Sequence, residues 1–188
     1  YQFDGPQGRL KLSDLFKGCS QLVVYHFMYG VDWEEGCPSC SFWADNFNGI
    51  PVHLAHRDVA FAVTSRGPYS LLEGYKKRMG WTFDWYSTAP GRFNEDFHVS
   101  FSPEELESGV AYYNYREGGF SGPEAPGVSV FYKERDSGDI FHTDSCFARG
   151  LDILNGAYHY LDLVPKGRDE DALPYAQDWI RRHDQYDD

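Results

Sequence analysis

The chain of 188 residues has few cysteines, and its basic residues are too few to balance the acidic ones. Four cysteines are too few to staple a scaffold with disulfides, and one close pair with two isolated cysteines is typical of a reducing compartment. No stretch approaches the roughly 18 apolar residues of a transmembrane helix, so none is predicted. Residues 1–5 have neither a basic region nor a long apolar stretch, so no secretory signal is expected there.

The shortage of basic residues also narrows the choice of partners. The sequence has 17 Lys and Arg against 29 Asp and Glu, for a formal net charge of -12. A surface of this sign repels phosphate backbones and anionic headgroups, so we expect neither nucleic acid nor a membrane as partner. Apolar residues are present in sufficient amount, at 41%, to fill the core of one domain over residues 1–188.

The most informative motif is the run Gly36-Cys37-Pro38-Ser39-Cys40. It follows an apolar stretch, 21–28, that is typical of a buried strand, and it precedes a segment, 41–57, that is compatible with a helix. Two thiols two residues apart at a strand-to-helix junction can close a small disulfide ring and reopen it by exchange. This context is the signature of a thioredoxin-like redox site.

The order of predicted elements agrees with that signature. Strands are expected at 21–29, 59–64, 81–86, 128–132 and 140–143, and helices at 41–57, 71–79 and 151–163, the first interrupted near Pro51. Helical crossovers require parallel strands in the first half, and the late hairpin is antiparallel. We therefore predict an α/β protein of thioredoxin-like fold, with a central mixed sheet flanked by helices.

Two segments lie outside this plan. Residues 87–126 are rich in Gly, Pro, Asn and Asp and are predicted to be an irregular insertion, with a short helix beginning at Ser102 and an edge strand at 112–115. The insertion could cover the dithiol or form the contact of a homodimer. A helical extension is expected over 164–188, with an amphipathic helix from Pro174 to Tyr186.

The spacing assigns a role to each residue of the dithiol motif. Cys37 is expected at the helix N-terminus, where unpaired N–H groups lower the pKa of a thiol, so it is the candidate nucleophile. Cys40, one turn inside the helix, is the candidate resolving thiol. Pro38 suits the first helical turn, and Ser39 completes the motif. The acidic residues in 32–35 would oppose the thiolate if they lie close.

Two further residues are candidates for supporting roles. His26 interrupts the apolar strand, and a buried ionisable group behind the resolving thiol could shuttle its proton. The alternative is a core histidine bonded to a backbone carbonyl. Trp33 is the tryptophan that we expect to contact substrate, because it lies beside the dithiol in the sequence. The isolated Cys19 and Cys146 are expected to be buried hydrophobic residues.

A metal site is the competing interpretation of the same cysteines. Twelve residues separate Cys40 from His53, and His56 follows after two more, which is close to a zinc-finger spacing. A zinc finger needs three to five residues between its histidines and a hairpin that carries the cysteines, and neither is present. A binding module in which the dithiol, with His53 and His56, holds a metal ion is therefore the alternative. The main hypothesis requires no cofactor and no metal.

Four segments together resemble a known family: 23–28, 36–45, 53–58 and 149–160. They are similar to a bacterial thioredoxin-like family catalogued as domain of unknown function 899, whose members are described as predicted dithiol-disulfide oxidoreductases. The resemblance covers nearly the whole chain. It implies a thioredoxin fold, Cys37 and Cys40 as the redox pair, and a bacterial cytoplasmic setting. The expected partners are a protein or small-molecule disulfide or thiol and an external reductant or oxidant.

The sequence departs from better-studied relatives at two places. Thioredoxins place a cis-proline directly before the fourth strand, facing the dithiol; here Pro126 and Gly127 precede Val128, and either could occupy that position. Residues 62–66 and the helix after them also resemble peroxiredoxins. The proline-threonine-cysteine motif of those enzymes is missing, so peroxidase activity is not predicted.

Overall fold

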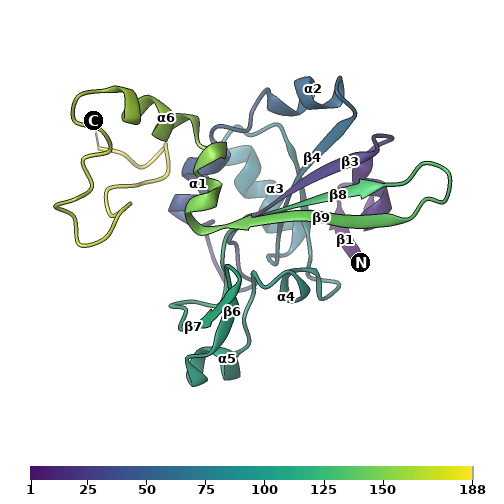
Figure 1. Ribbon diagram of the computed structural model, residues 1–188, viewed down its shortest axis with the longest axis horizontal. Coiled ribbons are helices and arrows are strands. Elements are labelled where there is room, and N and C mark those ends of the chain that lie inside the picture. The colour runs from purple at the N-terminus through teal and green to yellow at the C-terminus, as the bar shows by residue number, and fades with distance from the viewer. Residues whose placement is uncertain (188) are drawn as a thin grey trace.

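A seven-stranded mixed sheet forms the centre of the protein in the computed structural model, which describes residues 1–187 (Figure 1). Its strands are β1 (Gln2–Gly5), β2 (Gly8–Lys11), β3 (Gln21–His26), β4 (Val59–Ser65), β5 (Asp84–Ser87), β8 (Gly127–Lys133) and β9 (Ile140–Phe147). They lie in the order β2-β1-β5-β4-β3-β8-β9. The pairs β3–β4 and β4–β5 are parallel, whereas β8 is antiparallel to both β3 and β9. The predicted mixed α/β architecture is confirmed.

The helices are short, and several end where the sequence breaks them. They are α1 (Pro38–Ala44), α2 (Ile50–Ala55), α3 (Tyr69–Arg78), α4 (Phe93–Asp96), α5 (Pro103–Ser108), α6 (Gly156–Leu163) and the 3₁₀ helices η1 (Leu12–Phe16) and η2 (Ala148–Leu154). The helix predicted over 41–57 is split because Gly49 adopts a left-handed φ of 83° and a new helix begins at Ile50, with Pro51 in its first turn. None of the helices in residues 1–187 has the length and apolar character needed to cross a bilayer.

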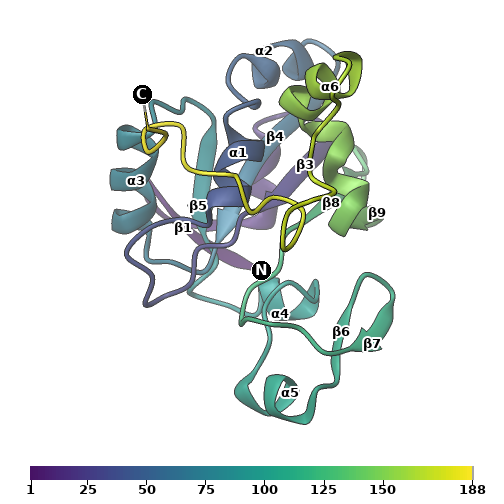
Figure 2. The same ribbon diagram turned by 90° about the vertical axis from the view of Figure 1, so that its left-hand side faces the viewer.

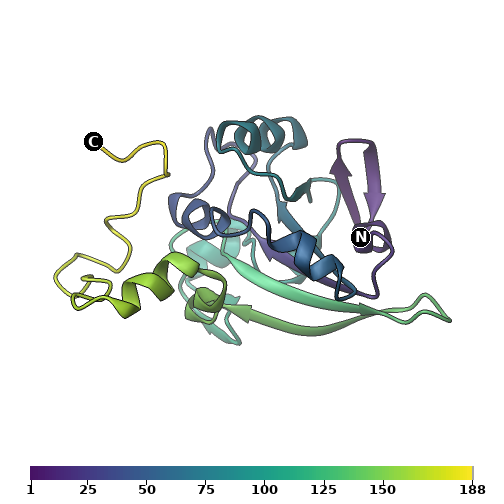
Figure 3. The same ribbon diagram turned by 90° about the horizontal axis from the view of Figure 1, so that it is seen from above.

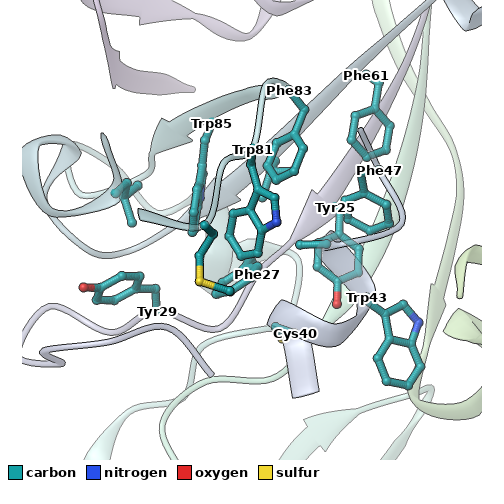
Figure 4. Packing of buried hydrophobic residues seen from close by; sticks show 14 of the residues in the cluster. Tyr25, Phe27, Tyr29, Cys40, Trp43, Phe47, Phe61, Trp81, Phe83 and Trp85 are labelled. Atoms are coloured by element: carbon teal, nitrogen blue, oxygen red, sulfur yellow. The ribbon is translucent and has the colours of Figure 1, made fainter. Parts of the chain in front are cut away.

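Each face of the sheet carries its own core. Side chains alternate along β3, so Tyr25 lies on one face and Val24 and His26 on the other. The first face packs against α1, α3, η2 and α6 and is rich in aromatic rings, among them Trp81 and Trp85 (Figure 4). The second face packs against η1 and α4. The aromatic face is the one that contains Cys40.

The predicted insertion projects from one end of the sheet between β5 and β8 (Figures 1 and 2). It contains α4, α5 and a separate hairpin of β6 (Ala111–Tyr113) and β7 (Arg116–Gly118). The helix expected at Ser102 is confirmed, with a capping box between Ser102 and Glu105 and Pro103 in the first turn. The tyrosines expected on an edge strand pair only with β7, so they do not extend the main sheet.

The chain after α6 has no helix in the described residues, so the helical extension predicted over 164–188 is wrong for residues 164–187, including the helix over 174–186; residue 188 lies outside the described part. Asp169 and Gln177 have φ of 53° and 78°, which a right-handed helix cannot contain. The segment 164–187, here called the C-terminal strap, instead crosses α1 toward α3 (Figure 2). Trp179 packs on Phe42 with ring centroids 5.5 Å apart, which anchors the strap. The strap lies at the end of the molecule opposite β1 and β2 (Figure 3).

Candidate active site at the start of helix α1

The dithiol lies where the sequence places it, at the beginning of α1. Cys37 is the residue before the helix, and its N–H donates to the carbonyl of Met28 at 3.1 Å, which ties the dithiol to the chain leaving β3. Pro38 is the first helical residue, where its missing N–H has no intrahelical partner to lose. Cys37 is partly exposed, whereas Cys40 is only 2% exposed. The first cysteine is therefore nearer to solvent than the second.

The two thiols have opposite electrostatic environments. A hydrogen bond from the Cys40 thiol, N–H groups of Cys40 and Ser39 and the charge of Arg182 lower the pKa of Cys37 to about 7, although burial opposes them. Burial is the main cause that raises the pKa of Cys40 well above its ordinary value. Near neutral pH, Cys37 is therefore partly a thiolate and Cys40 a thiol, which suits a nucleophile and its resolving partner.

Two residues of β3 and the chain after it also contact the buried thiol. The hydroxyl of Tyr25 points toward Cys40 and Trp43 (Figure 4), and burial raises the pKa of this hydroxyl well above 10. The backbone N–H of Met28 donates to Cys40 Sγ at 3.4 Å. Sequence reasoning missed both residues, because an apolar strand marks its tyrosine and methionine as core. Two-residue alternation along β3 could have placed Tyr25 on the side of α1.

Arg182 of the C-terminal strap holds the loop that leads into the dithiol. Its Nη2 and Nε donate to the carbonyl of Gly36 at 2.7 and 3.1 Å, and Nε also donates to the Tyr75 hydroxyl at 3.0 Å. Its Nη1 lies 2.8 Å from a carboxylate oxygen of Glu35, which also pairs with Arg78. Glu35 was expected to oppose the thiolate, but these two guanidinium groups neutralise its charge. No local motif signals Arg182, because it is 146 residues from Gly36.

A small cavity of about 170 Å³ opens beside Cys40 and is here called the dithiol pocket. Pro126 and Ser39 are among its lining residues. Gly127 begins β8 and pairs with His26, and a Cβ there would lie 2.9 Å from the Phe147 ring. Pro126 rather than Gly127 therefore faces the dithiol. No peptide bond within residues 1–187 is cis.

His26 lies on the opposite face of the sheet from Cys40, so the predicted proton shuttle behind the resolving thiol is wrong. Its ring stacks near Phe93 and Phe97, with centroids 5.4 and 5.8 Å away, and its Nε2 is 2.9 Å from Ser129 Oγ. Burial, with the nearby His142, lowers the pKa of His26 to about 3. It is a neutral core histidine, but it is bonded to a hydroxyl rather than to a carbonyl.

Trp33 lines a different cavity from the dithiol pocket. This larger space, about 980 Å³, lies between the loop after β3 and the insertion, and is here called the insertion cleft. Trp33 also packs against the aromatic core together with Cys37. Its predicted contact with substrate stays a prediction, but the structure shows that this contact would be made in the cleft.

The residues named for the alternative metal site do not form a set of ligands. His53 lies in α2 and His56 follows it, and both are exposed. Within residues 1–187, no group of three or more His, Cys, Asp or Glu side chains is close enough to hold a metal ion. Cys19 and Cys146, which were expected to be buried hydrophobic residues, are free thiols that pack against the hydrophobic cores but are only partly buried.

Comparison with known proteins identifies the family and the fold. The family model described as "Bacterial protein of unknown function (DUF899)" matches residues 1–186. No curated protein matches the sequence. Among solved structures, peroxidoxin BcpB from Mycobacterium tuberculosis is similar, with 14% identity and a TM-score of 0.56 over 83% of this chain and 89% of that one. Peroxiredoxin Q from Xanthomonas campestris has 13% identity and a TM-score of 0.53 over 84% of this chain and 88% of its own. At these identities the likeness shows a thioredoxin-like fold and nothing finer.

Proposed function

The chain belongs to the bacterial family of unknown function DUF899, and from this premise we propose that it is a thiol–disulfide oxidoreductase in which Cys37 is the nucleophile and Cys40 the resolving thiol. The observation that carries the proposal is the asymmetry of the two sulfurs. Cys37, a partly exposed residue whose thiol has a pKa of about 7, precedes by one turn the buried Cys40, whose thiol pKa is raised. Resting dithiols without a function have no need of this asymmetry.

The reaction follows from these two environments. The Cys37 thiolate attacks one sulfur of a substrate disulfide, forms a mixed disulfide and releases the other half as a thiolate. Cys40 then loses its proton and attacks the Cys37 sulfur, which closes the Cys37–Cys40 disulfide and releases the second substrate thiolate. Two electrons pass from the protein to the substrate, and an external dithiol reductant returns them. Run backwards, the same steps oxidise a substrate dithiol with an external oxidant.

The protein supplies the geometry for each step. The N–H groups of Ser39 and Cys40 point at the Cys37 sulfur and stabilise its negative charge before the attack. The N–H of Met28 and the hydroxyl of Tyr25 lie at the Cys40 sulfur, where they favour the thiolate that must form for resolution. We propose a soluble setting in the bacterial cytoplasm, where a reducing partner is available.

Replacing the nucleophile tests the proposal. Turnover of a protein disulfide such as insulin, coupled to a thiol reductant, should fall at least about 100-fold in Cys37→Ser. Cys19→Ser is the matched control, because it removes a free thiol outside the motif, and it should retain the wild-type rate. Equal turnover by wild type and Cys37→Ser would remove the proposed function.

A further inference from the structure

The insertion cleft adjoins the redox site through two segments of the chain. The loop that carries Trp33 along its wall continues directly into Cys37. On the other side, Glu124 lines the cleft two residues before Pro126, which lines the dithiol pocket. At about 980 Å³ the cleft has the size of a small-molecule site. A substrate bound here would therefore lie next to the residues that hold the dithiol.

Two side chains in the cleft have N–H groups that make no hydrogen bond within residues 1–187. Arg66 has a side chain only 31% exposed, and it forms an ion pair with Glu124 Oε1 at 3.4 Å rather than a hydrogen bond. The indole N–H of Trp33 also has no hydrogen-bond acceptor within residues 1–187. The indole N–H groups of the other four tryptophans each donate a hydrogen bond, at 2.8 to 3.0 Å. A guanidinium and an indole N–H that line the same cavity without a hydrogen-bond partner are available to a carboxylate.

A buried carboxylate, that of Glu124, also lines the cleft and can accept a hydrogen bond. Glu124 is only 2% exposed. Ser100 donates to its Oε2 at 2.5 Å, and Asn94 in turn donates to Ser100 Oγ at 3.2 Å, but Oε1 accepts no hydrogen bond within residues 1–187. Burial raises the pKa of this carboxyl to about 7, against the opposing effects of Ser100 and Arg66. A bound ammonium group would donate a hydrogen bond to Oε1 and favour the ionised form of the carboxylate.

The other charged side chains of the cleft determine which anions can bind. Asp32 and Glu105 line it, and Arg92 lies within 4 Å of the carboxylates of Glu95 and Asp96, which neutralise it. Arg66 pairs with one carboxylate, that of Glu124 at 3.4 Å, and its other N–H groups remain open to a ligand, in a cleft with an excess of acidic side chains. Such a site repels phosphates and dianions but accepts one carboxylate accompanied by an ammonium group.

Building on the proposed function, we infer that the insertion cleft binds the amino-acid end of a small thiol or disulfide substrate. Arg66 and Trp33 hold the α-carboxylate, and Glu124 accepts the α-ammonium group. The sulfur end of the substrate then extends along the Trp33 loop toward Cys37. The substrate class is a free amino acid or short peptide that contains a thiol or a disulfide, rather than a simple alkyl disulfide.

Binding can be measured apart from redox chemistry with the probe S-methyl-L-cysteine, which cannot exchange. Calorimetry on the Cys37→Ser protein should show binding at least about 10-fold tighter than that of 2-(methylthio)ethylamine, which lacks the carboxylate, or 3-(methylthio)propanoate, which lacks the amine. Arg66→Gln should weaken the probe at least about 10-fold. Trp33→Phe keeps the ring and removes the N–H, and it should weaken the probe about 3- to 10-fold.

Arg116→Gln is the matched control, because Arg116 is an exposed arginine of the insertion outside the cleft, and it should bind like wild type. Equal affinity for the three probes would overturn the inference. So would unchanged binding in Trp33→Phe, which is the decisive variant if Arg66→Gln does not fold.

Turnover separates this inference from the proposed function. The wild type should reduce cystine with a kcat/KM at least about 10-fold above that for cystamine, which lacks carboxylates, and Arg66→Gln should abolish the preference. Equal rates with both disulfides would overturn the inference and leave the oxidoreductase in place. Binding of the probe without turnover of either disulfide would remove the proposed function and leave the binding site.

Discussion

The dithiol pocket and the insertion cleft differ in how their polar groups are satisfied. At the entrance to the dithiol, Arg182 donates to Gly36 and Tyr75; in the dithiol pocket, the Trp43 indole donates to the carbonyl of Leu151, and Cys40 Sγ receives the N–H of Met28. In the cleft, the side-chain N–H groups of Arg66 and Trp33 make no hydrogen bond in residues 1–187, and Arg66 has only its ion pair with Glu124. In the first site the protein itself satisfies the polar groups, so the dithiol is held in place for reaction. In the second site some N–H groups have no hydrogen-bond acceptor in the protein, and a ligand can supply one.

The largest expected effect comes from removing the resolving thiol, which tests whether the dithiol site carries out the exchange. Cys40→Ser should lose multiple turnover at least about 100-fold, because the mixed disulfide on Cys37 has no internal thiol to release it. Mass spectrometry after one addition of a disulfide substrate should show a single covalent adduct on Cys37. Cys146→Ser, which changes a thiol outside the motif, should turn over normally. Rapid turnover by Cys40→Ser would mean that the pocket does not carry out the exchange.

A smaller effect should separate the cleft from the pocket by pH. Because burial raises the pKa of Glu124 to about 7, its contribution to stability is complete below an unfolded-state pKa of about 4.5 and is lost as pH rises through 7. Between pH 4.5 and 8 this loss amounts to about 3 kcal/mol. Urea unfolding at intervals across that range should show the loss in wild type and not in Glu124→Gln.

The control for this measurement is Glu117→Gln, which alters an exposed glutamate of the insertion hairpin. Its stability should follow the wild-type dependence on pH. The same dependence in Glu124→Gln would show that the buried carboxyl does not ionise in this range, and the cleft would then lack the anionic acceptor assigned to it.

The smallest predicted effect concerns the strap that completes the dithiol. Arg182→Gln removes a charge that favours the Cys37 thiolate, so the pKa of Cys37 should rise by up to about one unit. The rate of alkylation by iodoacetamide at pH 6.5 should fall about 3- to 10-fold, and Arg182→Lys should restore part of it. Arg181→Gln is the control, because the side chain of Arg181 donates to carbonyls of its own strap. An unchanged alkylation profile in Arg182→Gln would remove the positioning role.

Local patterns predicted the parts of the molecule that depend on neighbours in sequence. The position of Cys37 and Cys40 at a helix start, the capping box at Ser102 and the break before Pro51 each follow from residues within one turn. The order of strands and helices was sufficient for the mixed sheet, because parallel strands need crossovers and the late hairpin does not.

Other parts depend on contacts that no local pattern reveals. The strap has enough apolar residues to suggest an amphipathic helix, but Trp179 packs onto the aromatic core, Ile180 is buried, and Gln177 adopts a left-handed backbone. A functional role was predicted for His26 because it is a polar residue in an apolar strand. Its place on the second face follows from the alternation that puts Tyr25 on the first. Charge alone did not show that Arg66 and Glu124 meet, since they are 58 positions apart in sequence.

The anchoring of Gly36 by Arg182 also has a consequence for how the protein matures. The two residues are 146 positions apart, so a ribosome adds the guanidinium on the order of 10 s after it has added the dithiol. During that interval the nascent chain carries both sulfurs without the cation that favours the Cys37 thiolate. Full nucleophilicity therefore arrives only after the strap has been synthesised and has crossed α1.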